Sequence, residues 1–457
     1  MVEDERIRVL KDGDPRPESE GAAYVLYWMQ ASQRVLYNHA LAEAIARADT
    51  LGLPVVVGFG LMDDYPEANA RHYAFMLDGL RDVAAALKDK GVAFVLRRGA
   101  PPDVALALAK QAAVVVCDRG YLRHQVQWRQ TVADRAPCPV IEVETDAVVP
   151  VDTVTDKLEH AARTIRPKIE KRLDDFIREI HVPFPKKTAR GLSLESEDVS
   201  KPRALLKALK LDHDVPPLDR SGGERAAQNR LDGFLDDGIE RYEPGRSDPL
   251  SNGSSDLSAF LHFGQISPVQ IAWRVRRQPR SDSRASFLEE LIVRRELAFN
   301  FVRFCAGYDS YDGAVPDWAK ATLNAHKDDA RPAIFTRARM EAAETGDEAW
   351  DAAMREMKRT GALNNAVRMY WGKKIIEWTG TPRYAYETAL ALNNRWFLDG
   401  RDPNSFANIA WLFGRHDRPF QERKVLGKVR PYTTAALKRK FDLKAWIAAN
   451  GPQADLF

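Results

Sequence analysis

The chain has 457 residues, of which 45% are hydrophobic and 29% charged, and its formal net charge is +3. At about 150 residues per domain, this length predicts two or three domains and excludes a short binding module. No apolar run approaches the roughly 18 residues that span a bilayer, and the acidic start Met-Val-Glu-Asp-Glu-Arg is unlike a secretory leader. We therefore expect a cytoplasmic protein without membrane segments.

Three cysteines, Cys117, Cys138 and Cys305, lie far apart and form no CxxC or Cys/His spacing. Neither a disulfide framework nor a metal site is therefore expected. The small positive net charge leaves nucleic acid as a candidate partner without itself indicating one.

Short apolar runs alternate with amphipathic stretches through the first third of the chain. The runs are rich in Val and predict strands near 23–29, 54–59, 93–96, 113–117 and 140–144. The stretches between them predict helices near 35–51, 68–90, 102–111 and 123–133. Such β-α repeats require right-handed crossovers and a doubly wound parallel sheet. We therefore predict an α/β, Rossmann-like domain over residues 1–180, with ligands beyond the carboxyl ends of its strands.

The chain then becomes polar and basic, and residues 181–222 are predicted to be an interdomain linker. Beyond it, amphipathic helical patterns dominate, at 225–235, 267–276, 286–304, 366–378 and 382–392. Eight of the ten tryptophans occur from Trp273 onward. We predict a larger all-α domain over residues 223–457 and expect the chemistry of the protein there.

Trp371 and Trp378 are seven residues apart, about two helical turns, so their indoles lie on one face of the predicted helix. Redox-capable aromatics in this arrangement provide a path for electrons. The alternative is a helix that buries two large aromatics in a core.

Two polar groups in the helical domain suit an anionic heterocyclic ligand. The hydroxyls of Ser254–Ser258, near a helix start, predict a phosphate site, although a Ser-rich N-cap has the same pattern. Arg368 and Asp399 are candidates to pair beside a polar ring, and Asn393 offers an amide to a ring nitrogen. A plain interhelical ion pair is the alternative for Arg368 and Asp399.

A basic patch without any acidic residue follows near the end of the chain, next to the aromatic residues Trp411, Phe420 and Tyr432. It suits DNA phosphates and stacked bases, while a solvated face is the alternative. The patch consists of Arg423, Lys424, Lys428, Arg430, Lys438, Arg439 and Lys440.

Several long motifs occur in an order that resembles class II cyclobutane pyrimidine dimer photolyases, and the resemblance covers nearly the whole chain. They are Tyr-Trp-Met-Gln (27–30), Ala-Arg-Thr-Ile-Arg-Pro-Lys-Ile (162–169), Phe-Leu-Glu-Glu-Leu-Ile-Val-Arg-Arg-Glu-Leu-Ala (287–298), Arg-Met-Tyr-Trp-Gly-Lys-Lys-Ile-Ile-Glu-Trp (368–378), Leu-Asp-Gly-Arg-Asp-Pro-Asn (398–404), Gly-Lys-Val-Arg (427–430) and Lys-Arg-Lys-Phe-Asp (438–442). The family joins an antenna-binding α/β domain to a helical FAD domain.

The resemblance implies FAD as cofactor, with Asn393 near flavin N5 and the Arg368–Asp399 pair beside the isoalloxazine. The other residues that it places around FAD are Tyr242, Ser254, Ser255, Leu257 and Ser258. It further implies a second, antenna chromophore of deazaflavin or folate type in the α/β domain.

The resemblance also assigns the electron path and the lesion contacts. Trp371 is implied as the donor nearest the flavin, Trp350 as the next link and Trp378 as an accessory branch. Glu290, Met369 and Trp411 are implied to contact a pyrimidine dimer that is flipped out of DNA. The implied phosphate contacts are Arg246, Arg423, Lys428, Arg430 and Lys438. For Glu290, an exposed helix pair with Arg294 at i+4 is the alternative.

Three positions depart from the family pattern. Gly361-Ala-Leu-Asn-Asn replaces Gly-Lys-Met-His-Gly on the substrate side, where we expect Asn365 to bind a pyrimidine carbonyl. Phe420 replaces a tryptophan. Phe335 stands where relatives carry a tyrosine, which rules out a terminal tyrosyl radical at that position.

We therefore expect a monomeric, light-driven lyase that splits pyrimidine dimers in ultraviolet-damaged DNA. The first alternative is a cryptochrome-like flavin photoreceptor without repair activity, and the second is a nucleic-acid-binding protein without catalysis. Retention of Glu290, Met369 and Trp411 favours repair.

Overall fold

The structure, a computed structural model, describes residues 2–251 and 253–452. The chain divides into two compact units whose segments alternate along the sequence. The first comprises Met1–Val154, Ile169–Asp232 and Leu257–Arg277, and the second comprises Thr155–Lys168, Gly233–Asp256 and Gln278–Phe457. The functional division into residues 1–180, 181–222 and 223–457 remains a prediction beside this structural one.

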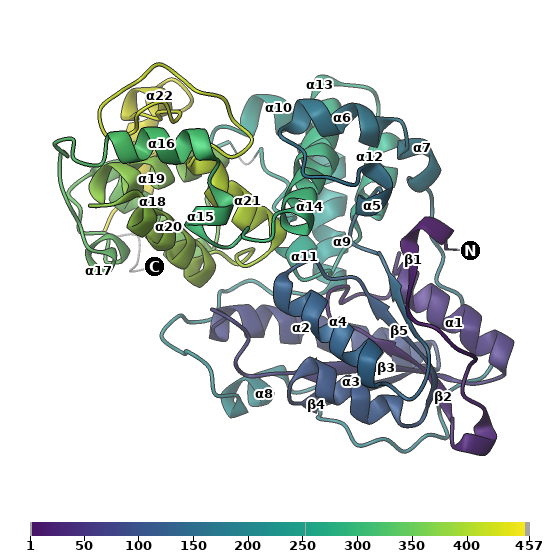
Figure 1. Cartoon of the computed structure of the whole chain (residues 1–457). Helices are drawn as coiled ribbons and strands as arrows, with labels where there is room; N and C mark the ends of the chain where they lie inside the picture. Colours follow the sequence, from purple (N-terminus) through teal and green to yellow (C-terminus); the bar gives the residue numbers. More distant parts are fainter. Residues whose placement is uncertain (1, 252, 453–457) are drawn as a thin grey trace. The chain divides into compact units, whose positions relative to one another are not determined.

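A six-stranded sheet in the order β1-β6-β5-β2-β3-β4 forms the centre of the first unit (Figure 1). Its strands are β1 Ile7–Lys11, β2 Tyr24–Trp28, β3 Val55–Leu61, β4 Ala93–Arg98, β5 Ala112–Asp118 and β6 Val140–Val143. Strands β2 to β6 pair in parallel, as the sequence predicts. Strand β1 is an addition to the prediction and pairs antiparallel with β6.

Helices cover both faces of the sheet, which confirms the doubly wound arrangement. Helices α1 His39–Leu51 and α2 Ala70–Asp89 pack on one face, against Val25, Tyr27 and Val57. Helices α3 Pro101–Ala109 and α4 Arg123–Arg135 pack on the other, against Leu26 and Val115. Because both faces are covered, β2, β3 and β5 are buried at every position, which is why their sequences are continuous apolar runs.

The remaining elements of the first unit are short. They are the 3₁₀ turns Asp4–Arg6 and Glu18–Glu20 and the helices α5 Val151–Val154, α7 Leu173–Phe176, α8 Pro202–Ala208, α9 Glu224–Gly233, α11 Ser258–His262 and α12 Pro268–Arg276. Glu224, the first residue of α9, accepts hydrogen bonds from the backbone N–H groups of Val35 and Leu36 and ties α9 to the loop after β2.

The second unit is helical, and no segment that the structure describes in it forms a β-strand. Its elements are α6 Ala162–Glu170, a π-helix Phe234–Gly238, a 3₁₀ turn Ile239–Arg241, α10 Tyr242–Gly245, α13 Asp282–Leu288, a π-helix Glu289–Arg294, α14 Arg295–Phe304, α15 Tyr311–Ala314, α16 Asp317–Ala325, α17 Arg337–Glu341, α18 Glu348–Thr360, α19 Asn365–Trp378, α20 Pro382–Trp396, α21 Pro403–Leu412, α22 Thr434–Lys438 and α23 Leu443–Ala449.

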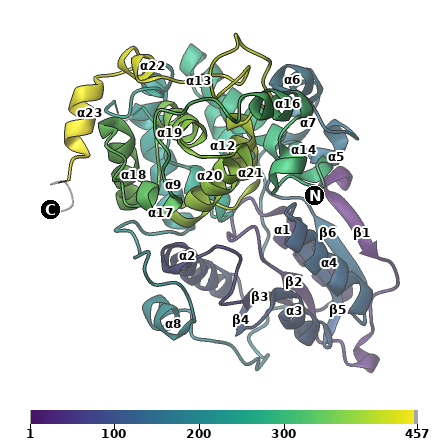
Figure 2. The same ribbon diagram turned by 60° about the vertical axis from the view of Figure 1, so that its left-hand side comes forward.

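Helix α19 lies in the interior of the second unit, against α18, α20, α21 and α22 (Figure 2). Ten of its fourteen residues are buried, so it is enclosed on all sides rather than amphipathic. Its start is fixed by Asn364, whose side chain accepts a hydrogen bond from the N–H of Ala366. None of the helices in residues 2–251 and 253–452 has the length and apolarity needed to cross a membrane.

Candidate active site

Three polar side chains that the sequence proposes around a flavin belong to neighbouring elements of the second unit. Arg368 of α19 forms an ion pair with Asp399, at 3.3 Å between Nη2 and Oδ1. The guanidinium of Arg368 also stacks over the ring of Phe397, 3.9 Å from its centroid. Asn393 of α20 is 1% exposed and donates from Nδ2 to Oδ1 of Asn394 at 3.0 Å. The predicted Arg368–Asp399 pair is therefore present.

These groups suit the flavin that the resemblance implies. The Nε of Arg368 is buried without a hydrogen-bond partner, so the structure holds a donor that a ligand acceptor would satisfy. Asp399 provides an acceptor and Asn393 a buried amide, the mixture that a ring with both donors and acceptors requires.

A second carboxylate stands close to this pair. Asp402 caps α21 by accepting from the N–H of Ser405. Burial, followed by repulsion from Asp399, raises the pKa of Asp402 to about 6. Asp402 thus adds a second carboxyl group close to Asp399.

The three tryptophans of the predicted electron path form a continuous row. Trp371 and Trp350 are both fully buried, and the indole N–H of Trp350 donates to the backbone carbonyl of Trp371 at 2.9 Å. The rings of Trp350 and Trp378 are 5.6 Å apart between centroids, and Trp378 in turn contacts Phe335 at 5.3 Å. Trp350 therefore touches both residues that sequence spacing places on one face of α19.

Sequence reasoning did not single out Met354, which completes this row. Met354 lies one helical turn after Trp350 on α18 and is fully buried. Its sulfur accepts the indole N–H of Trp371 at 3.1 Å. A buried methionine is ordinarily core packing, and only its i+4 spacing from Trp350 marked it in the sequence.

Glu290 pairs with Arg246, at 3.0 Å between Oε1 and Nη1, rather than with Arg294. The expected alternative pair with Arg294 is therefore not the one that forms. The π-helix at Glu289–Arg294 explains the change, because it brings residues five apart together: Arg294 instead binds Glu289, at 3.2 Å. Glu290, the predicted lesion contact, and Arg246, the predicted phosphate contact, thus form an ion pair with each other.

Tyr242 adjoins this pair. The guanidinium of Arg246 lies 5.8 Å from the centroid of its ring, and the ring also contacts Phe287 at 5.2 Å. Burial, followed by the negative charge of Glu290, raises the pKa of the Tyr242 hydroxyl to about 12. Tyr242 is therefore neutral and able to donate a hydrogen bond at physiological pH.

The two asparagines that depart from the family pattern play different parts. Asn364 caps α19, and its Nδ2 donates to the backbone carbonyl of Arg246 at 3.0 Å. Asn365 is exposed at the first residue of the helix. Asn364 thus ties the start of α19 to the Arg246 segment, and Asn365 is the one accessible to a ligand.

The remaining predicted lesion residues lie on α19 and α21. Met369 is buried, at 7% exposure, whereas Trp411 is half-buried. The helices approach closely beside them: a Cβ added at Gly372 would come within 2.2 Å of Leu412. The fully buried Lys373 donates to the carbonyl of Leu412, and burial lowers its pKa to about 7.

The basic patch is largely exposed, at Arg423, Lys424, Lys428, Lys438, Arg439 and Lys440. Arg430 is the exception, because both oxygens of Asp417 accept from its guanidinium, at 2.7 and 2.9 Å. The loop at 423–427 turns sharply, since Val425 and Gly427 have positive φ. His326 bridges to this loop by binding Glu422 at 3.0 Å and Asp329 at 2.7 Å.

The predicted phosphate turn is divided between the units. Ser254 and Ser255 belong to the second unit, and Leu257 and Ser258 to the first. Helix α11 has only five residues, and Leu257 at its N-cap makes no side-chain cap. This helix therefore contributes little dipole, and the phosphate role of the turn remains a prediction.

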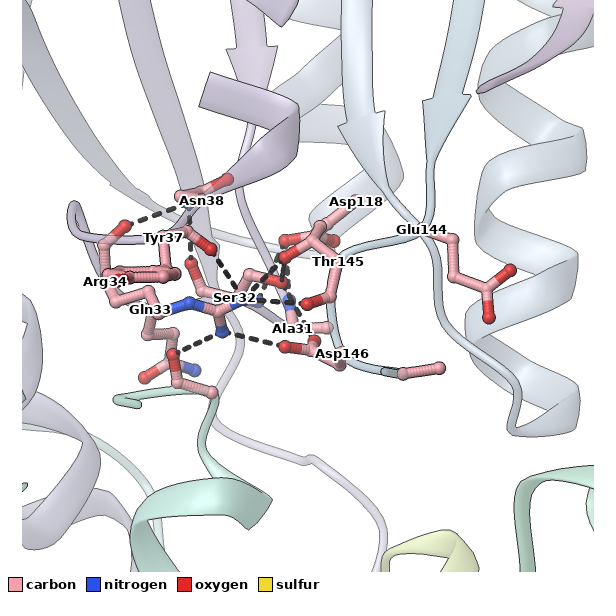
Figure 3. Close-up of polar contacts among 12 residues, drawn as sticks. Ala31, Ser32, Gln33, Arg34, Tyr37, Asn38, Asp118, Glu144, Thr145 and Asp146 are labelled. Atoms are coloured by element: carbon pink, nitrogen blue, oxygen red, sulfur yellow. Dashed lines mark hydrogen bonds and ion pairs between the residues drawn. The ribbon is translucent and has the colours of Figure 1, made fainter. Parts of the chain in front are cut away.

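The sheet of the first unit changes strand order between β2 and β5, where doubly wound folds bind ligands. Asp118, at the end of β5, accepts there from the N–H groups of Gln30, Ala31 and Ser32, at 2.9 to 3.0 Å. Arg34 pairs with Asp146 at 2.7 Å in the same cluster (Figure 3). The loop after β2 is thus held in place by buried charges.

The chain thus combines an α/β unit built on a mainly parallel sheet with a helical unit that contains a buried tryptophan row. The DNA photolyase family model matches residues 25–188. A deoxyribodipyrimidine photo-lyase of Methanothermobacter thermautotrophicus is 43% identical, over 98% of this chain and 98% of its own length. One of Arabidopsis thaliana is 35% identical, over 98% and 92%. The chain belongs to the DNA photolyase family.

A solved structure supports the fold. The crystal structure of a class III photolyase from Agrobacterium tumefaciens matches with a TM-score of 0.71 at 21% identity, covering 94% of this chain and 86% of that one. At this identity the match bears on architecture, and it agrees with the mainly parallel sheet and the helical unit found here.

Proposed function

We propose that this protein is a class II photolyase, which uses FAD and light to split cyclobutane pyrimidine dimers in DNA. The observation that carries the proposal is the Arg368–Asp399 pair, in which Arg368, with its unsatisfied buried Nε, lies on the same helix as Trp371 of the tryptophan row. Similarity to proteins named deoxyribodipyrimidine photo-lyase over almost the whole chain supports it.

When bound and fully reduced, FAD supplies the light-driven electron that opens the cyclobutane ring and afterwards takes it back. Arg368 offers its free Nε and its positive charge to the ring system, and Asp399 holds the guanidinium in place. Asn393 would offer its uncharged amide to the ring system near N5. Trp371, Trp350 and Trp378 form the row along which electrons reach the cofactor for photoreduction.

The lesion side is proposed at Glu290, Met369, Trp411 and Asn365. Glu290 hydrogen-bonds the flipped pyrimidine, Met369 and Trp411 pack on it, and the exposed amide of Asn365 binds a carbonyl. Because Glu290 and Arg246 bind each other in this structure, DNA entry exchanges their ion pair for two new contacts, carboxylate to base and guanidinium to phosphate.

The patch residues Arg423, Lys428 and Lys438 are exposed and suit DNA phosphates around the lesion. Arg430 serves the same surface indirectly, by holding Asp417. We propose damaged DNA as the partner of a monomeric enzyme. An antenna chromophore of deazaflavin or folate type is proposed for the first unit, and reconstitution with each pigment followed by absorption spectroscopy tests that assignment.

The alternative function is a cryptochrome-like photoreceptor. The tryptophan row serves both functions equally, so only the lesion residues separate them. The ion-paired Glu290 and the half-buried Trp411 favour repair, since a signalling protein needs neither a carboxylate nor an indole for a pyrimidine.

Trp371→Phe tests the proposed division of labour. We expect slow photoreduction of oxidised FAD in this variant and near-normal repair of ultraviolet-damaged oligothymidine when the enzyme is chemically reduced beforehand. Trp446, which lies outside the tryptophan row, provides the control: Trp446→Phe is expected to leave the rates of photoreduction and of repair unchanged. Equal loss of both activities in Trp371→Phe contradicts the role of Trp371 as an electron relay.

A further inference from the structure

The thioether of Met354 contacts the indole N–H of Trp371. A base in the same position would take the proton of this N–H when Trp371 is oxidised. The N–H of Trp371 donates to Sδ of Met354 at 3.1 Å, and both side chains are fully buried. The ring of Phe397 also contacts that of Trp371, edge-on at 6.2 Å between centroids. A thioether is a weak hydrogen-bond acceptor and does not take up a proton in water.

The acceptor of the second indole is equally unable to take a proton. The N–H of Trp350 donates to the backbone carbonyl of Trp371 at 2.9 Å. The carboxylate of Asp347 on the same helix is already bound, by the Tyr370 hydroxyl at 2.7 and 2.9 Å and by the backbone N–H of Trp350 at 3.0 Å. The indoles of Trp371 and Trp350 thus have their N–H groups satisfied by acceptors that are not bases.

We propose that Met354 fills the position next to the Trp371 N–H with a non-basic side chain, so that oxidised Trp371 keeps its proton and the charge leaves by electron transfer alone. The inference rests on the proposed photoreduction of FAD. Its physical basis is that an oxidised indole is a far stronger N–H acid than a neutral one, and becomes a neutral radical only where a base that accepts its proton is in contact.

One electron leaves Trp371 for the photoexcited oxidised flavin, and Trp371 becomes a radical cation that retains its N–H. Trp350 gives one electron to Trp371, which returns to its neutral closed-shell form without any proton movement. Trp378 then gives one electron to Trp350, and a thiol reductant in solution restores Trp378. A base at residue 354 would instead hold the oxidised state at Trp371 as a neutral radical.

The test compares three substitutions in the FAD-loaded protein. Met354→His supplies a base, since burial keeps an imidazole in its neutral, proton-accepting form. Met354→Leu removes the acceptor without adding a base. Met357→His is the matched control, because Met357 lies on the same helix and is also fully buried.

Transient absorption after a laser flash distinguishes the cation from the neutral radical. We expect a tryptophan radical cation in the wild type, Met354→Leu and Met357→His, and a neutral Trp371 radical with loss of Trp378 oxidation in Met354→His. In the wild type, the first decay is expected to have the same rate in H₂O and D₂O. A neutral Trp371 radical in the wild type, a slower decay in D₂O, or a cation in Met354→His overturns the proposal.

A second readout does not depend on light or on repair. In protein labelled with ¹⁵N-indole tryptophan, the Trp371 N–H resonance, assigned by Trp371→Phe, is expected to shift in Met354→Leu and to stay in place in Met357→His. An unshifted resonance in Met354→Leu overturns the contact. Failure of photoreduction in the wild type would instead count against the proposed function, while this resonance still decides the Met354 bond.

Discussion

Glu289 and Glu290 are adjacent carboxylates of one π-helix for which the structure predicts opposite consequences of the same substitution. Glu290 makes a single pair with Arg246, and the two side chains are 41% and 34% exposed. Glu289 binds Arg166 through two hydrogen bonds, at 2.7 and 3.0 Å, and also Arg294. Replacing each by glutamine removes one charge at nearly constant volume.

The exposure of the pair limits what Glu290→Gln costs in folding. A solvent-exposed ion pair contributes about 0–1 kcal/mol, so we expect the free energy of unfolding to fall by less than about 1 kcal/mol. A charged hydrogen bond to a flipped pyrimidine is worth about 1–3 kcal/mol, which is about 5- to 150-fold in affinity for damaged over undamaged DNA. Glu290→Gln is therefore predicted to lose discrimination and keep stability.

Glu289→Gln is the matched control. Its glutamine loses the ion pairs with Arg166 and Arg294. We expect this loss to lower the free energy of unfolding by about 1–2 kcal/mol and to leave the preference for damaged DNA unchanged. Fluorescence anisotropy with damaged and undamaged oligothymidine in the dark, together with thermal unfolding, measures both quantities. If Glu290→Gln lowers stability as much as Glu289→Gln and leaves discrimination unchanged, Glu290 is a structural residue and the reasoning fails.

Three further predictions concern the patch loop and the buried lysine. Gly427→Ala is expected to weaken DNA binding and to leave photoreduction unchanged. Alanine at φ +53° costs about 1 kcal/mol or more, and its Cβ would come within 3.0 Å of the Thr322 carbonyl. Unchanged salt-dependent DNA binding in this variant would contradict the prediction. Hydrogen bonds that the imidazole of His326 donates to Glu422 and then Asp329 raise the pKa of His326. Protonated His326 therefore stabilises the loop below pH 6.5, and this contribution is lost as the pH rises through the raised pKa of the folded state. DNA affinity measured against pH is expected to fall across that range. We expect His326→Gln to abolish this fall. Burial lowers the pKa of Lys373 to about 7, so between pH 7 and the ordinary lysine pKa of 10.5 the unfolded chain binds one more proton than the folded one. The free energy of unfolding is therefore expected to rise with pH across that window. If chemical denaturation shows the same rise in Lys373→Met, a group other than Lys373 causes it.

The core strands were predictable because burial on both faces leaves a plain mark in the sequence. Strand β1 was missed because it is a five-residue edge strand in which Leu10, directly after Val9, interrupts the alternation that Ile7, Arg8 and Val9 begin. The π-helix at Glu289–Arg294 was missed because an apolar pattern does not distinguish its wider turn from an α-helix. For this reason Glu290 pairs with Arg246 and not with Arg294, which α-helical spacing had suggested.

The candidate site was predictable where a residue's role depends on its own chemistry. Arg368 and Asp399 are complementary ions and were found as a pair. The bond of Glu290 to Arg246 and that of Trp371 to Met354 join different helices, and no local pattern in the sequence records such contacts. The folding of residues 257–277 into the first unit was hidden for the same reason.

Light-driven repair of pyrimidine dimers is directly observable as the return of thymine absorbance. Purified protein with chemically reduced FAD is mixed with ultraviolet-damaged oligothymidine, and the absorbance of thymine is followed under blue light and in darkness. We predict recovery of thymine absorbance in the light with multiple turnovers and none in the dark. Bound, reduced flavin without recovery in the light would contradict repair and favour the photoreceptor.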